Sequence, residues 1–183
     1  GVKKMEGIYQ KYGKDTVDKT CKDLMDYSER RMRAEITQIP DGVYSFSDFV
    51  EDDGIEDKKF EIFVNIHKKD SDVIADFSKS SSQAKGPINA TLGVTISATY
   101  NALLHLTDPS IPKNSGCFRP IRVIASPGSV VNVDFPAPSV GGNTETHPKI
   151  AGVVMGALSG AVPNFAMAAE GCTHGNFVFG GVD

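Results

Sequence analysis

The sequence predicts an α+β fold in which N-terminal helices precede an antiparallel β-meander and a mixed α/β segment with two buried helices. Apolar residues recur at helical spacing in residues 1–40, alternate with polar residues in 41–86, and return to helical spacing in 87–183. Pro40 and the polar, turn-prone stretch 78–86 mark the two changes of pattern. These three ranges are therefore the helical, the β-rich and the low-charge α/β segments of the chain.

The helical segment contains a short helix and a long one. Gly13 is expected to end the first, and Asp15 is expected to cap the second. One face of the long helix carries residues at helical spacing, namely Val17, Cys21, Leu24, Ser28, Met32 and Ile36. This spacing is typical of an amphipathic helix, which must stop before Pro40 because proline cannot continue it.

The β-rich segment predicts strands with one face in water. A first strand follows Asp41-Gly42, a second covers 60–66 and a third runs over 73–77. The acidic loop 51–57 gathers oxygen ligands of the kind that calcium prefers, but it lacks the spacing of a twelve-residue calcium loop. We favour a solvated hairpin tip over a calcium site.

In the low-charge segment, residues 91–106 are long and apolar enough for a buried helix, which His105 would close near the C-terminal dipole. Residues 120–125 and 130–135 bracket Ser126-Pro127-Gly128-Ser129 and predict a β-hairpin. The polypeptide ends in a predicted strand at 177–183.

A second buried helix is predicted from Ile150 to Ala161. Gly152, Gly156 and Gly160 line up along it, and each glycine costs a helix interior about 1 kcal/mol. Close backbone packing against that stripe is the favoured explanation. Gly156–Gly160 also approaches a nucleophile elbow but misses the Gly-x-Ser-x-Gly pattern, and no phosphate-cradling Gly-Lys-Ser/Thr loop occurs.

Composition excludes several classes of protein. The 183 residues are 40% hydrophobic and 23% charged, and the net charge of −4 argues against a nucleic-acid partner. No apolar run reaches the roughly 18 residues that a membrane helix needs. Cys21, Cys117 and Cys172 are too widely spaced for a paired disulfide framework, which favours a reducing compartment. We expect a cytoplasmic protein without membrane contact.

Charge is distributed unevenly along the chain. Residues 1–86 contain 15 of the 19 basic and 18 of the 23 acidic residues, which leaves 87–183 only about 9% charged against a usual 25%. Such a surface is expected to be covered by the rest of a longer polypeptide, by a partner subunit, or by residues 1–86. With Gly1 in place of an initiator Met, we expect a truncated piece of a longer chain.

Two polar loops interrupt the low-charge segment, at 112–120 and 141–147. The second leads into a helix N-terminus where an anion could sit, or where Asn143 or Thr144 simply caps the helix. Cys172-Thr173-His174 could pair a thiolate with an imidazole, although a single cysteine is more often a small buried residue.

These loops carry a resemblance to the hydantoinase B/oxoprolinase family, which includes N-methylhydantoinase B subunits, 5-oxoprolinase and the related subunits of acetone and acetophenone carboxylases. The resemblance spans nearly the whole chain and rests on ordered blocks at 27–29, 40–42, 76–77 with Gln83, 86–90, 111–121, 141–146 and 179–183. Lys79 and His147-Pro148 depart from the family pattern.

The resemblance implies a subunit of an ATP-dependent enzyme that hydrolyses a cyclic amide, or of a related ketone carboxylase. It implies a hetero-oligomer in which a hydantoinase A-type partner subunit or domain handles ATP, with divalent-metal ligands upstream of Gly1. Arg119 would then pair with an anion, and Asn143, Glu145 and His147 would act as hydrogen-bonding or acid/base groups. A non-catalytic scaffold or subunit-interaction module is the alternative, and a thiol enzyme using Cys172 is a third possibility.

Overall fold

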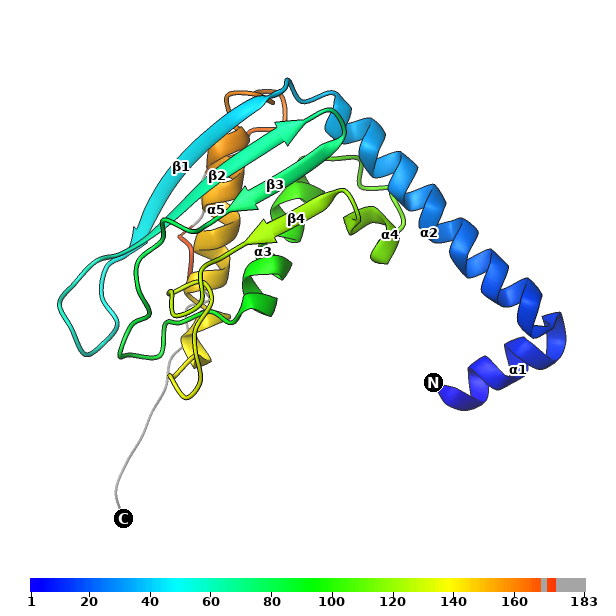
Figure 1. Ribbon diagram of the computed structural model, residues 1–183, viewed down its shortest axis with the longest axis horizontal. Helices are drawn as coiled ribbons and strands as arrows, with labels where there is room; N and C mark the ends of the chain where they lie inside the picture. Colours follow the sequence, from blue (N-terminus) through cyan, green and yellow to red (C-terminus); the bar gives the residue numbers. More distant parts are fainter. Residues whose placement is uncertain (169–170, 174–183) are drawn as a thin grey trace, which may run out of the picture.

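The computed structural model describes residues 1–168 and 171–173. Its elements in chain order are α1 (Val2–Tyr12), α2 (Lys14–Thr37), β1 (Gly42–Val50), β2 (Phe60–Lys69), β3 (Asp72–Asp76), α3 (Leu92–His105), α4 (Ser115–Phe118), β4 (Ile121–Ile124), the 3-10 helix η1 (Val140–Gly142) and α5 (Thr146–Leu158). The strands form one sheet in the order β1-β2-β3-β4, and α3 and α5 cover one of its faces (Figure 1). The predicted α+β class is confirmed.

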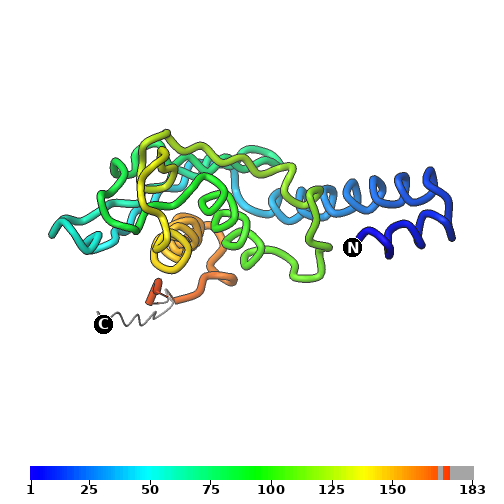
Figure 2. The backbone as a smooth tube through the Cα atoms, turned by 90° about the horizontal axis from the view of Figure 1, so that it is seen from below, coloured from blue at the N-terminus to red at the C-terminus, as the bar shows by residue number. Residues whose placement is uncertain are grey.

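The antiparallel meander forms as predicted. β1 pairs with β2 from Gly42 opposite Lys68 to Val50 opposite Phe60, and β2 pairs with β3 in the same antiparallel sense. The alternating apolar residues of β2, namely Phe60, Ile62, Val64 and Ile66, are buried against the helices. The opposite face carries the mostly polar alternates of β2, and none of the described helices lies over it (Figure 2).

The hairpin predicted at 120–135 is wrong. β4 lies parallel to β3, with Ile121 opposite Val73, and the chain then leaves the sheet. Val130 and Val131 are fully buried beside the segment before α3, where the Ala90 N–H donates to the Val130 carbonyl at 2.7 Å and Ala90 accepts from Val133 at 3.1 Å. The apolar second arm therefore bonds to a segment that is distant in sequence instead of to its neighbour.

The two N-terminal helices project from the body as an elbow (Figures 1 and 2). Gly13, at φ 80°, separates them as predicted, but the second begins at Lys14 with Gly13 at its N-cap, so Asp15 is not a cap. The α2 stripe is covered at both ends but not in the middle. Val17 is buried near the elbow and Met32 and Ile36 are fully buried against the body, whereas Cys21 and Leu24 are exposed.

The two buried helices are confirmed, and the close-packing explanation holds for one glycine. A Cβ on Gly156 would lie 2.8 Å from the Phe46 ring of β1, so α5 and the sheet need that glycine to approach. Gly152 makes only ordinary contact, at 3.7 Å from the Cys172 sulfur, and Gly160 lies beyond α5 with nothing within 4 Å. The predicted strand at 177–183 lies outside the described residues.

Candidate functional site

The loop 112–120 docks helix α2 onto the body, in a cluster that we call the helix clamp. The clamp consists of Asp26, Ser28, Glu29, Asn114, Gly116 and Arg119. Asn114 Nδ2 donates to Ser28 Oγ at 2.8 Å, while Asn114 Oδ1 accepts from the Gly116 N–H at 2.8 Å and so caps α4. A Cβ on Gly116 would lie 1.9 Å from the carbonyl oxygen of Met25, so only glycine fits. Asn114 therefore fixes this loop.

Arg119 completes the helix clamp through ion pairs. Its Nη1 donates to Asp26 Oδ1 at 2.7 Å and to Glu29 Oε2 at 2.9 Å, and the other oxygen of Glu29 accepts from Arg33 Nε. The hydrogen bonds from Arg119 hold the pKa values of Asp26 and Glu29 below their usual range. The anion-pairing fork predicted for Arg119 thus engages carboxylates of its own chain, and its catalytic role stays a prediction.

A second cluster, which we call the loop clamp, joins residues 86–90 to 141–146 around the buried side chain of Asn89. Asn89 is fully buried, and its Nδ2 donates to the carbonyls of Ala84, Gly86 and Pro138 at 2.9, 3.1 and 2.9 Å. Its Oδ1 accepts from the Ala84 N–H at 2.7 Å. A Cβ on Gly142 would lie 2.2 Å from the Asn89 carbonyl oxygen, so the two loops need a glycine where they touch.

Three further contacts hold the loop clamp. The Gly141 N–H donates to the Pro87 carbonyl at 2.7 Å, and the Thr146 hydroxyl donates to the Ile88 carbonyl. Asp53, only 2% exposed, accepts from the N–H groups of Glu56, Gly86 and Ile55, and these bonds lower its pKa. The solvated hairpin tip predicted for 51–57 is therefore wrong at Asp53, which ties the acidic loop to the clamp.

The remaining predicted site residues lie around the start of α5. Glu145 occupies the N-cap position without a capping side-chain bond, so the expectation that Asn143 or Thr144 caps the helix is wrong. Asn143 is exposed. Glu145 Oε1 accepts from the Thr173 hydroxyl at 3.0 Å, and Glu145 lines a pocket of about 260 Å³ beside Lys149 and Cys172.

His147 lies on a different side of α5 from Glu145. Positions two apart in a helix are rotated by about 200°, which places these two side chains on nearly opposite faces. The structure therefore does not bring the four predicted residues together. Instead His147 lines a pocket of about 480 Å³ over α3, and Arg119 lines an adjoining pocket of about 450 Å³.

These two adjoining pockets share Tyr100 and Phe118, and together we call them the α3 groove. The two rings are stacked, with centroids 4.1 Å apart and planes within 4°. Burial raises the pKa of Tyr100. The other lining residues, besides His147 and Arg119, are Gly93, Ile96, Ser97, Asn101, Leu104, Ser115 and Ile121. The groove thus has an aromatic floor, a His at one end and an Arg at the other.

The sequence analysis missed Tyr100 and Phe118. Tyr100 is the one aromatic residue in an otherwise aliphatic and small-residue helix, which is a weak signal. Nothing in the local pattern shows that Phe118, on a separate element, stacks on it. The pair is visible only once the helix clamp has placed α4 beside α3.

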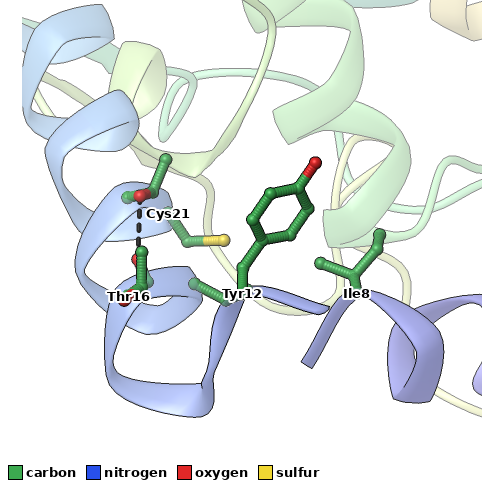
Figure 3. Close-up of a pocket in the computed structure, with 6 residues that line it drawn as sticks. Ile8, Tyr12, Thr16 and Cys21 are labelled. Carbon is green, nitrogen blue, oxygen red and sulfur yellow. Dashed lines mark hydrogen bonds between the residues drawn. The ribbon is translucent and has the colours of Figure 1, made fainter. Parts of the chain in front are cut away.

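Two other features carry less chemistry. A pocket of about 360 Å³ between α1 and α2 is lined by Ile8, Tyr12, Thr16, Val17, Thr20 and Cys21, and Figure 3 shows Tyr12 and Cys21 beside this space. It holds no charged group. Cys117 is buried, and its sulfur donates to the Asn114 carbonyl at 3.0 Å, which fits the small-residue interpretation. His174, the proposed partner of Cys172, lies outside the described residues.

Across residues 1–168 and 171–173, no group of three or more His, Cys, Asp or Glu side chains could hold a metal ion. The described acidic loop therefore gives no support to the calcium interpretation. Within the same residues, none of the helices is both long and apolar enough to cross a membrane.

The comparisons with known proteins place this geometry in a family. Residues 1–183 match the family model for hydantoinase B/oxoprolinase. The putative B subunit of a D-/L-hydantoinase from Pseudomonas sp. (strain NS671) is 32% identical over 93% of this chain and 31% of its own length. The chain belongs to the hydantoinase B/oxoprolinase family, as the sequence resemblance predicted, and spans a third or less of the length of the curated relatives that it matches.

Solved structures agree with this assignment. The crystal structure of an ATP-dependent caprolactamase from Pseudomonas jessenii superposes with a TM-score of 0.79 at 28% identity, over 87% of this chain and 28% of that one. A nucleotide-free acetone carboxylase gives a TM-score of 0.77 at 16% identity, over 87% of this chain and 23% of that one, and so shares the fold.

Proposed function

We propose that this chain is a segment of the hydantoinase B-type subunit of an ATP-dependent enzyme that hydrolyses a cyclic amide. Membership of the family and the likeness to a caprolactamase support the reaction class. The observation that supports a role for this segment is the α3 groove, in which stacked Tyr100 and Phe118 lie between His147 and Arg119.

The groove suits a small ring that carries an amide. The apolar carbons of such a ring pack against the aromatic floor, which supplies contact area without a need for polar partners. His147 is the group placed to exchange a proton with the amide as its C–N bond breaks, since the two ring nitrogens of an imidazole can donate and accept a hydrogen bond. Arg119, fixed by Asp26 and Glu29, donates to the polar edge of the ring.

In this proposal the other chemistry lies elsewhere in the assembly. A hydantoinase A-type subunit or domain holds ATP, and the divalent metal binds to residues upstream of Gly1. The present segment binds the ring and handles a proton, in a hetero-oligomer located in the cytoplasm. Asn143 and Glu145 lie outside the groove, and Glu145 accepts a hydrogen bond from Thr173.

The test uses the full-length subunit together with its partner. His147→Gln should lower kcat for a cyclic amide such as hydantoin, 5-oxoproline or caprolactam by roughly a hundredfold, because it removes the acid/base group. Tyr100→Ala should raise KM, because it removes the floor. His67→Gln, on the helix-free face of the sheet, is the matched control. Activity of His147→Gln equal to that of His67→Gln would remove the groove from the active site.

A scaffold or subunit-interaction module is the second candidate. The observation that favours it is the helix clamp, because Arg119 already pairs with two carboxylates of its own chain. On this alternative, Tyr100→Ala and Phe118→Ala weaken association of the subunits in analytical ultracentrifugation, while kcat per assembled complex stays unchanged. The two readouts therefore separate the candidates.

A further inference from the structure

The side of α3 that lines the groove carries two parallel rows of residues, one apolar and one small or polar. The members of the two rows are Ile96, Tyr100 and Leu104 in the first and Gly93, Ser97 and Asn101 in the second. Residues four apart lie one above the other on a helix, so each row follows the axis of α3. The groove therefore has a polar edge, where a hydroxyl and a carboxamide lie one turn apart.

The Asn101 carboxamide has no partner within the part of the chain that the structure describes. Neither it nor the Ser97 hydroxyl makes a hydrogen bond to another described residue, and both residues are exposed. The carboxamides of Asn89, Asn114 and Asn132, in contrast, donate to groups of their own chain. Asn101 thus keeps an acceptor oxygen and two N–H donors available to a molecule in the groove.

A carboxamide is complementary to the amide of a small ring. Such a ring forces its amide to be cis, so the N–H and the C=O point to the same side. The carboxamide oxygen can then accept from the ring N–H while its NH2 group donates to the ring C=O. An open-chain secondary amide is almost always trans, and its N–H and C=O point to opposite sides. A single carboxamide therefore distinguishes cyclic from open-chain amides.

We propose that Asn101 is a specificity-determining residue of the α3 groove, where it pairs with both the N–H and the C=O of a cyclic amide. This inference rests on the proposed function, because it takes the groove as the place where the ring binds. Asn101 lines the same pocket of about 480 Å³ as His147 and the Tyr100 ring, which is large enough for a small ring. The ring C=O has a second lone pair, which remains available to Arg119.

Ligand-observed NMR titrations of the full-length subunit with its partner, without ATP, test this pairing independently of turnover. The probes are 2-pyrrolidone, γ-butyrolactone and N-methylpropanamide, which have equal numbers of non-hydrogen atoms. The lactone is cyclic but has no N–H, and N-methylpropanamide has an N–H but is trans. The unmodified enzyme should therefore bind 2-pyrrolidone roughly tenfold more tightly than either of the other two.

Two substitutions of Asn101 separate its two hydrogen bonds. Asn101→Leu removes both, so the three probes should bind within about twofold of one another. Asn101→Asp keeps an acceptor for the N–H but loses the donor. It should bind the two amides equally and still reject the lactone. Asn164→Leu, at an exposed asparagine that does not line the groove, is the matched control and should keep the full preference for 2-pyrrolidone.

A preference for 2-pyrrolidone that survives in Asn101→Leu would overturn the proposal. So would its absence in the unmodified enzyme, whether through equal binding of the three probes or through no binding. His147→Gln distinguishes such a failure from failure of the proposed function, since it should lower kcat without changing the preference. Full activity of His147→Gln with a preference that depends on Asn101 would remove only the proton transfer. A lowered kcat in His147→Gln with a preference that ignores Asn101 would remove only the role of Asn101.

Discussion

The helix clamp and the loop clamp perform the same task with different chemistry. Each joins segments that are far apart in sequence. Each also contains a glycine packed against a backbone carbonyl of the other segment, Gly116 against Met25 and Gly142 against Asn89. The helix clamp adds exposed ion pairs around Arg119, whereas the loop clamp adds a fully buried amide, Asn89. The difference shows that a contact between distant segments can be reinforced by charge in one place and by burial in another.

The physical cost of losing each clamp should differ accordingly. Exposed ion pairs gain little because water and salt screen the charges. A buried carbonyl or N–H that loses its partner costs about 1–3 kcal/mol, since no water replaces the bond. Substitutions in the loop clamp are therefore expected to destabilise the chain more than substitutions of the ion pairs.

The largest effect is expected for Gly142→Ala. Its Cβ would lie 2.2 Å from a backbone carbonyl oxygen, so the two loops must move apart. We expect the free energy of unfolding to fall by about 3 kcal/mol or more. Gly160→Ala, where nothing lies within 4 Å, is the matched control and should be close to neutral. Urea unfolding measures both, and equal stabilities would contradict the close approach.

Asn89→Ala ranks next. The substitution removes the partner of the buried groups of Ala84 and Gly86 and of the part-buried Pro138 carbonyl, and we expect the free energy of unfolding to fall by about 2–4 kcal/mol. Asn143→Ala, on the exposed side of the same block, should stay within about 0.5 kcal/mol of the parent chain. A comparable loss in both variants would mean that the loop clamp is not held by the Asn89 amide.

The sequence predicted elements whose signal is local. Periodic apolar residues predicted α2, α3 and α5, and alternation predicted β2, because each pattern depends only on which face is buried. The hairpin after β4 failed for the opposite reason. Val130 and Val131 have strand-like composition, but the Val130 carbonyl accepts from Ala90, its N–H donates to Ser81, and the Val131 carbonyl accepts from Thr95. No local pattern encodes partners that lie about forty residues away.

The candidate site shows the same limit more strongly. Polar density in the two loops led to Arg119, Asn143, Glu145 and His147, yet Arg119 serves the helix clamp and Glu145 accepts from Thr173. Of these four residues, only His147 and Arg119 line the α3 groove. Tyr100 and Phe118 form the floor of the groove, and a search for clusters of polar residues does not identify them. A resemblance between sequences marks such blocks without separating residues that fix a loop from residues that meet a ligand.

Arg119→Gln should have a smaller effect than either loop-clamp substitution. The variant loses the pairs with Asp26 and Glu29, but all three side chains reach water and α2 keeps Met32 and Ile36 in the core. We expect a modest decrease in Tm that shrinks further in 1 M salt. Arg122→Gln, an exposed arginine on β4, is the control and should leave Tm unchanged. A decrease that salt does not reduce would show that Arg119 acts through packing instead.

The smallest effect concerns pH and distinguishes charge from burial within the helix clamp. Because Arg119 lowers the pKa values of Asp26 and Glu29 in the folded chain, their stabilising contribution is complete above the ordinary values of 3.8 and 4.5. It is lost as the pH falls through the lowered values, where both carboxylates take up protons even in the folded state. The stability difference between the parent chain and Arg119→Gln should therefore be constant near neutral pH and narrow below about pH 4.

The difference between the parent and Gly142→Ala, which involves no titrating group, should stay the same over that range. Urea unfolding at a series of pH values gives both differences, and a parallel decline of the two would mean that acid weakens the whole fold and not this ion pair.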